Sequence, residues 1–255
     1  MKRKILFVLL AVFLLTFVVS GGMLLHVFLE YQKADEFYTE LQEEVVEKVV
    51  TPPPVTEGET PPAEKTASAP ISVNFEKLLK KNCDVVGWIY SEDTVISYPV
   101  VQAKDNKVYL HKALDGSYLR SGTVFVDYRN EAVGKDRNYL IYGHDMRNDT
   151  MFGSLSEYKK QKYYQAHPVL YYLTPEGAYR IDLVIGAVVN TKDMIYLTNP
   201  DQEAFAEYLA KLKKKSTFHS KVELTPEDKV VTLSTCSYEF DNARYIVIGK
   251  LVPLE

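Results

Sequence analysis

The 255-residue sequence contains little cysteine, no excess of positive charge and only one long apolar run. Its two cysteines, Cys83 and Cys236, are too few for a disulfide-stapled scaffold or a cysteine-rich metal cluster. Residues 70–255 carry 24 acidic and 24 basic side chains, so this part lacks the basic surface expected of a nucleic-acid-binding domain. We therefore expect no nucleic-acid partner.

The apolar run covers residues 5–29 near the N-terminus. A helix of this length reaches ~37 Å, which is enough to cross a hydrocarbon core of ~30 Å. A cleaved signal peptide is the alternative, but the run is longer than the usual apolar region of about 7–15 residues. Basic residues precede the run and acidic residues follow it. The positive-inside rule then predicts cytoplasmic residues 1–4, a transmembrane signal-anchor over 5–29 and an extracellular remainder.

Residues 30–70 have the composition of an attachment to a domain. Residues 30–69 carry ten acidic and three basic side chains. Within them, residues 31–50 predict an acidic helix with an apolar side chain at every fourth position: Phe37, Leu41, Val45 and Val49. The proline-rich residues 51–70 cannot bury a core and favour a semi-stiff polyproline spacer. We expect this helix and linker to hold residues 71–255 away from the membrane.

Residues 71–255 are predicted to be mainly β. Asn74 is placed to cap a short helix, and further helices are expected over 151–158 and 201–214. Eight runs rich in valine, isoleucine, tyrosine and threonine predict strands over 85–90, 95–101, 122–128, 138–142, 169–173, 178–190, 229–235 and 244–252. Eight strands with few helices indicate a barrel or a sandwich.

A cysteine and an arginine stand at the facing ends of the last two predicted strands. Cys236 follows one strand and Arg244 begins the next, after seven intervening residues. Strands joined this closely are usually antiparallel neighbours ~4.7–4.9 Å apart, so the two side chains are expected to meet. A guanidinium there would favour the nucleophilic thiolate and could hold an oxyanion.

His144 is the histidine best placed to be a catalytic base, because it follows an apolar strand and begins a loop. An imidazole with a pKa near neutrality suits proton transfer to and from a thiol and an amine. His111, His167 and His219 are expected to be solvated. On the residues alone, Cys236 could instead fill the core or pair with Cys83, and Arg244 could protect a strand edge.

The sequence TLSTC at 232–236, Arg244 and the YGH at 142–144 together resemble the sortases, and most of all class B. The similarity continues through residues 84–89, 98–102, 122–130 and 138–152, and so covers residues 71–255. The long helix over 201–214 is a class B feature. This resemblance implies an eight-stranded sortase barrel with N-terminal helices, and a cysteine transpeptidase that needs no cofactor and no metal.

The resemblance also implies roles for the three residues. Cys236 would attack the threonine carbonyl in the C-terminal sorting signal of a surface protein and form a thioester. His144 would protonate the leaving amine and deprotonate the incoming one, and Arg244 would hold the substrate backbone and the oxyanion. The acceptor would be an amine of a peptidoglycan precursor or of a pilin subunit, in a Gram-positive envelope.

Six further residues match family positions that line the substrate groove: Asn106, Leu110, Thr191, Ile195, Tyr196 and Ser234. Ser237 follows the cysteine directly, where some class B members carry an acidic residue. Because this position borders the groove, the preferred sorting motif does not follow from any one relative. Two other functions remain as alternatives. One is a cysteine peptidase that uses water, although a papain-like chain would place the cysteine before the histidine. The other is a non-catalytic adhesin.

Overall fold

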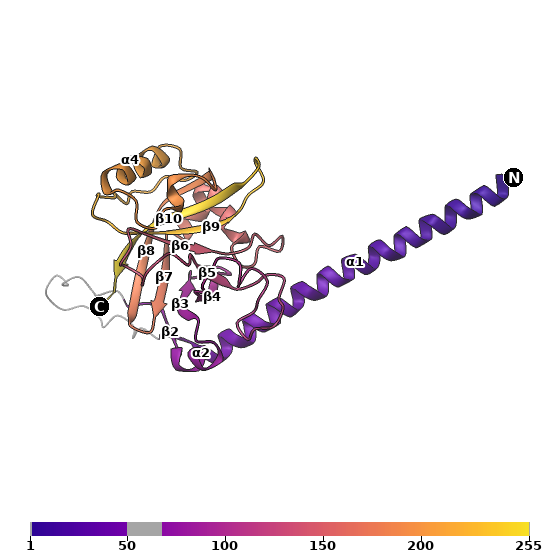
Figure 1. Cartoon of the computed structure of the whole chain (residues 1–255), viewed down its shortest axis with the longest axis horizontal. Helices are drawn as coiled ribbons and strands as arrows, with labels where there is room; N and C mark the ends of the chain where they lie inside the picture. The colour runs from indigo at the N-terminus through magenta and orange to yellow at the C-terminus, as the bar shows by residue number, and fades with distance from the viewer. Residues whose placement is uncertain (1, 50–67, 255) are drawn as a thin grey trace, which may run out of the picture.

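The computed structural model describes residues 2–49 and 68–254, and most of the predicted proline-rich linker lies outside them. A long N-terminal helix, α1 (Lys2–Val45), projects from a β-barrel (Figure 1). In the described residues it is the one helix long and apolar enough to cross a membrane, a property that signal sequences share. Large apolar side chains are exposed along its first part, from Ile5 to Leu29.

The second part of α1 packs on the barrel. Its buried side chains are Ala34, Tyr38, Leu41 and Val45, which lie on one face of the helix. The predicted apolar stripe therefore shares Leu41 and Val45 with the buried face, whereas Phe37 is only partly buried and Val49 lies beyond the helix end. The prediction was partly wrong because an α-helix has ~3.6 residues per turn, so residues at every fourth position drift around the helix and do not stay on one face.

A small two-stranded sheet follows α1. Strand β1 (Val46–Lys48) pairs antiparallel with β2 (Ile71–Val73), so the two ends of the intervening segment lie side by side. Helix α2 (Phe75–Lys81) comes next, and the side chain of Asn74 accepts a hydrogen bond from the backbone N–H of Lys77 at 3.0 Å. This is the N-cap expected from the sequence.

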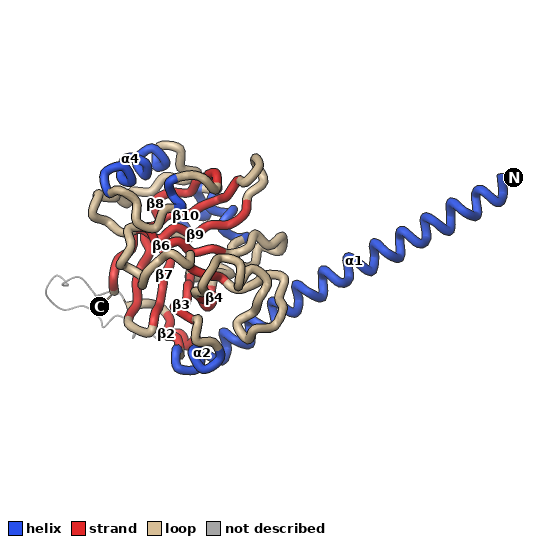
Figure 2. The backbone as a smooth tube through the Cα atoms, viewed as in Figure 1, coloured by secondary structure: helices blue, strands red, loops and turns tan. Residues whose placement is uncertain are grey.

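Eight strands form one closed barrel in the order β10-β8-β7-β3-β4-β5-β6-β9 (Figure 2). Their bounds are β3 (Val85–Tyr90), β4 (Ser97–Val101), β5 (Val124–Val126), β6 (Asn138–Tyr142), β7 (Val169–Thr174), β8 (Gly177–Asn190), β9 (Val230–Cys236) and β10 (Ala243–Pro253). All eight predicted strands are confirmed, and the barrel replaces the sandwich alternative. Strand β5 is shorter than predicted.

Short helices connect the strands outside the barrel. The helix expected over 151–158 is a 3₁₀-helix (Gly153–Lys159), followed by α3 (Gln161–Ala166). Helix α4 (Gln202–Lys213) lies between β8 and β9, and the side chain of Asp201 caps it by accepting from the N–H of Ala204. Phe205 and Leu209 of α4 pack against β8 and β10 residues in a second apolar cluster.

The parallel pairing of β6 with β9 positions the site. Tyr142, the last residue of β6, stands opposite Ser234 near the end of β9. Strands that run in the same direction end at the same rim of a barrel. The residues that follow β6 and those that end β9 therefore meet there.

Candidate active site

Cys236 and Arg244 are paired across β9 and β10, as the sequence predicts. Cys236 is the last residue of β9 and is half-buried, and the turn 237–242 carries the chain into β10. The Arg244 guanidinium donates to the carbonyl of its neighbour Ala243 at 2.8 Å. Both Cys236 and Cys83 are free thiols, so the alternative of a disulfide between them is wrong.

Backbone contacts fix His144 beside the end of β9. The N–H of Gly143 donates to the carbonyl of Ser234 at 3.2 Å, and the hydroxyl of Thr235 donates to the carbonyl of Gly143 at 2.9 Å. A Cβ at position 143 would lie 2.6 Å from Cγ of Phe152, so only glycine fits before His144. These contacts extend the β6–β9 pairing up to the histidine.

The imidazole of His144 has two close neighbours. Its Nε2 lies 2.7 Å from the carbonyl of Leu110, which can only accept, so Nε2 carries the proton and Nδ1 is the free acceptor. The His111 ring stacks on it with 5.3 Å between centroids. Burial and the charge of His111 lower the pKa of His144, against the opposing effect of the Leu110 carbonyl. The imidazole is therefore neutral near pH 7. His111 is exposed as predicted, but it is not an isolated surface residue.

Cys236, His144 and Arg244 line one groove of about 370 Å³. Five of the six residues predicted to contact substrate line it too: Asn106, Leu110, Thr191, Tyr196 and Ser234. Ile195 does not. Its side chain is fully buried in the cluster beneath α4, and its carbonyl accepts from the amide of Asn138 at 2.6 Å. Position 195 supports the loop that carries Tyr196 instead of facing substrate.

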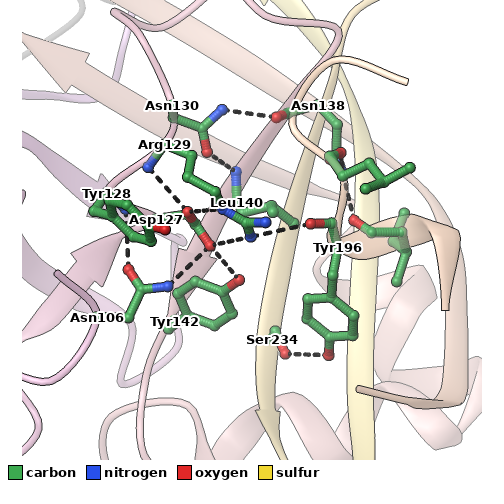
Figure 3. Close-up of polar contacts among 12 residues, drawn as sticks. Asn106, Asp127, Tyr128, Arg129, Asn130, Asn138, Leu140, Tyr142, Tyr196 and Ser234 are labelled. Atoms are coloured by element: carbon green, nitrogen blue, oxygen red, sulfur yellow. Dashed lines mark hydrogen bonds and ion pairs between the residues drawn. The ribbon is translucent and has the colours of Figure 1, made fainter. Parts of the chain in front are cut away.

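A buried carboxylate organises the far side of the groove (Figure 3). Asp127 has no exposed surface, and its oxygens accept from Nε and Nη2 of Arg129 at 2.8 Å, from the Tyr142 hydroxyl at 2.8 Å and from the Asn106 amide at 3.0 Å. Burial alone would raise the pKa of Asp127, but these hydrogen bonds outweigh it and hold that pKa below its ordinary value. The carboxylate is therefore charged and its partners are held in place.

The same network continues toward the cysteine. Nη2 of Arg129 donates to the carbonyl of Tyr196 at 3.1 Å, and the Tyr196 and Ser234 hydroxyls are 2.8 Å apart. The rings of Tyr142 and Tyr196 stack with centroids 6.3 Å apart. Asp127 and Arg129 were not among the residues predicted to form the site. The signal in the sequence that could have identified them is the pair of opposite charges, Asp127 and Arg129, that follows the buried strand β5.

A thiol, a neutral imidazole and a guanidinium on one groove have the composition of a cysteine acyl-transfer site. The described residues contain no cluster of side chains suited to a metal ion. A closed eight-stranded barrel with this groove at one rim thus defines a class of enzyme with a cysteine nucleophile.

Comparison with known proteins agrees with this class. The family model of the sortase domain matches residues 89–252. Sortase B of Listeria monocytogenes is 37% identical over 179 residues, which are 69% of this chain and 72% of that protein. The structure of a Staphylococcus aureus sortase B–substrate complex matches with a TM-score of 0.67 and 33% identity, over 71% of this chain and 85% of that one. The structure of sortase B from B. anthracis matches with a TM-score of 0.71 and 31% identity, over 89% of this chain and 99% of that one.

The chain therefore belongs to the sortase family, in class B, and is a cysteine transpeptidase.

Proposed function

We propose that the protein is a membrane-anchored sortase that cleaves a C-terminal sorting signal after threonine and transfers the protein to an amine of a peptidoglycan precursor. The observation that supports this most directly is the pairing of Cys236 with Arg244 on a groove that His144 also lines. We place residues 1–4 in the cytoplasm, residues 5–29 in the membrane, and residues 30–70 and the catalytic domain of residues 71–255 outside the cell.

In the first half of the reaction, the neutral His144 accepts the thiol proton of Cys236 at Nδ1 as sulfur attacks the threonine carbonyl. Arg244 stabilises the oxyanion that forms, through the planar fork of its guanidinium. The C–N bond then breaks, and His144 returns the proton to the leaving amine. A thioester on Cys236 remains and conserves the energy of the peptide bond.

In the second half, the amine of the acceptor attacks the thioester and gives up a proton to His144. The C–S bond breaks, and the thiolate of Cys236 recovers that proton. Leu110 contributes to both halves, because its carbonyl fixes the Nε2–H tautomer of His144. The path of the extended substrate peptide would be lined by five side chains: Leu110, Tyr196, Asn106, Ser234 and Thr191.

The test uses the full chain in detergent, because residues 34–45 of α1 cover part of the barrel core. We expect peptides of the NPxTx or xPxTG type to form an acyl adduct on Cys236, seen as a mass increase, and triglycine to convert the adduct into a new amide. Cys83→Ser is the matched control and should label normally, whereas Cys236→Ala should not label.

The same experiment separates the alternatives. Release of the adduct by water alone would favour a cysteine peptidase. Transfer to a lysine side chain in preference to triglycine would favour a pilin-polymerising sortase. No adduct with either class of peptide would contradict the proposed sorting reaction.

A further inference from the structure

A barrel loop contacts α1 where the apolar run of the helix ends. Nη1 of Arg120 lies 3.3 Å from a carboxylate oxygen of Glu30, the first charged residue after the run. Tyr118, Leu119 and Arg120 enclose a hollow of about 260 Å³ with α1 residues from His26 to Lys33. Leu119 is buried, whereas 64% of Tyr118 is exposed. The loop thus sits at the level of Leu29 along the helix.

In the described residues, the second part of α1 is fixed to the barrel by side-chain hydrogen bonds. Helix α1 is continuous from Lys2 to Val45. Its second part is bonded to the barrel, since the Tyr38 hydroxyl donates to the carbonyl of Gly122 and the Gln42 amide donates to the carbonyl of Ser97 at 2.9 Å. If residues 5–29 cross a bilayer, the headgroups of its outer leaflet therefore lie beside the loop.

The side chains at this level suit a lipid headgroup layer. Tyr118 presents an exposed ring with a polar end, which is the type of residue that collects at membrane interfaces. A second exposed pair stands on the turn between β9 and β10, where Tyr238 is 82% and Phe240 49% exposed. Figure 1 shows this turn on the side of the barrel from which α1 projects. We call Tyr118, Arg120, Tyr238 and Phe240 the membrane-facing rim.

Both parts of the rim adjoin the groove. Cys236 and Arg244 stand at the base of the turn that carries Tyr238 and Phe240. On the other side, the carbonyl of Arg120 lies 3.1 Å from Nδ1 of His111, whose ring stacks on His144. Each part of the rim is therefore close to one groove residue, the turn to Cys236 and the Arg120 loop to His144.

From this placement we infer that the membrane-facing rim rests on the surface of a phospholipid bilayer, so that the groove opens at the headgroup layer. The inference rests on the proposed membrane anchor. A substrate that is itself held in the bilayer then reaches Cys236 without leaving the membrane surface.

The test measures how closely the rim approaches lipid in the full-length protein. Tryptophan is introduced singly as Tyr118→Trp and Phe240→Trp, and the protein is reconstituted in vesicles of phosphatidylcholine and phosphatidylglycerol, with and without brominated acyl chains. The native Trp88 is fully buried and gives a constant background. We expect the brominated lipid to quench both introduced tryptophans.

Two controls make the outcome decisive. Leu79→Trp lies on α2, which Lys81 ties to Glu44 at 2.8 Å. Because Glu44 is about 21 Å along α1 from Glu30 at ~1.5 Å per residue, Leu79→Trp should remain unquenched. Phe28→Trp reports insertion of the anchor itself.

The rim would be overturned, and the anchor left intact, by one result. In that result Phe28→Trp is quenched, whereas Tyr118→Trp and Phe240→Trp are quenched no more than Leu79→Trp. Absence of quenching at Phe28→Trp would overturn both the anchor and the rim. Acyl transfer from a soluble peptide, measured in the same vesicles, shows separately whether the proposed chemistry on Cys236 holds.

Discussion

Cys236 and Arg244 are directly opposite partners across the antiparallel strands β9 and β10, so the backbone of the barrel places the two side chains on the same face of the sheet. No flexible loop lies between either residue and the sheet, because both belong to strands. Side chains on rigid elements hold a reactive geometry more closely than side chains on loops.

For Arg244, we predict that Arg244→Ala lowers kcat by about 10²–10³-fold, the usual cost of a lost oxyanion donor. Arg244→Lys should recover little activity, since an ammonium cannot reproduce the planar fork. Steady-state kinetics with a fluorescent sorting peptide measure both. Near-normal turnover of Arg244→Lys would show that charge alone matters at this position.

The stacking of His111 on His144 leads to a prediction about pH. Burial and His111 lower the pKa of His144, so His111→Ala should raise it by removing the neighbouring charge and exposing the ring. The acid limb of kcat/KM, where the base becomes protonated, should then move to higher pH. His219→Ala changes an exposed histidine outside the groove and should leave the profile unchanged. An identical acid limb in His111→Ala and wild type would contradict the role assigned to the stack.

Asp127→Asn tests the buried carboxylate. Because the pKa of Asp127 in the folded protein lies below its ordinary value, its stabilisation is complete above the ordinary pKa of ~3.9 and is lost as the pH falls through the folded value. We expect Asp127→Asn to lower the free energy of unfolding at neutral pH by ~1.5–3 kcal/mol, as for hydrogen bonds to a charged group. The difference from wild type should shrink in more acidic solution.

The free energy of unfolding of both variants is measured by urea denaturation. Asp182→Asn is the matched control for Asp127→Asn. Asp182 also pairs with an arginine two residues away, Arg180, at 2.8 Å, but both side chains keep contact with solvent. Its loss should cost only ~0–1 kcal/mol. Equal effects of the two substitutions would mean that burial adds nothing to the Asp127 network.

Gly122→Ala should disturb the support of His144. Gly122 has φ +58°, and an added Cβ would collide with the carbonyl of Tyr109 and crowd that of Leu110, the residue that holds Nε2 of His144. A non-glycine residue in such a backbone conformation costs ~1–3 kcal/mol before any collision. We expect a lower Tm by calorimetry together with a lower kcat. Gly177→Ala, where nothing lies within 4 Å of the added Cβ, should change neither.

Local patterns in the sequence predicted the local structure well. The strands, the cap at Asn74 and the pairing of Cys236 with Arg244 all depend on residues that are close in the chain. The position of His144 after an apolar strand likewise identified the third residue of the site. The resemblance to a family then favoured the barrel over the sandwich and added six substrate-binding candidates, five of which line the groove.

Contacts between distant segments could not be read in this way. Ile195 was assigned to substrate, but it fills the space beneath α4, because its neighbours come from a helix and strands that periodicity cannot position. His111 was expected to be solvated, and the structure places its ring on His144 through the folding of a loop. The burial of Tyr38 against the barrel depends equally on distant residues, since its hydroxyl donates to the carbonyl of Gly122.

The pairing of β1 with β2 determines whether the length of the proline-rich segment can affect the position of the groove. Both ends of that segment are held in one small sheet beside α1. Additional residues in the segment would therefore lengthen a loop without moving the groove away from α1. The entropic cost of closing such a loop rises only slowly with its length. If α1 is the proposed membrane anchor, the distance of the groove from the membrane is therefore set by α1. An epitope tag or a reporter domain inserted between β1 and β2 should then leave that distance, and access to the substrate, unchanged.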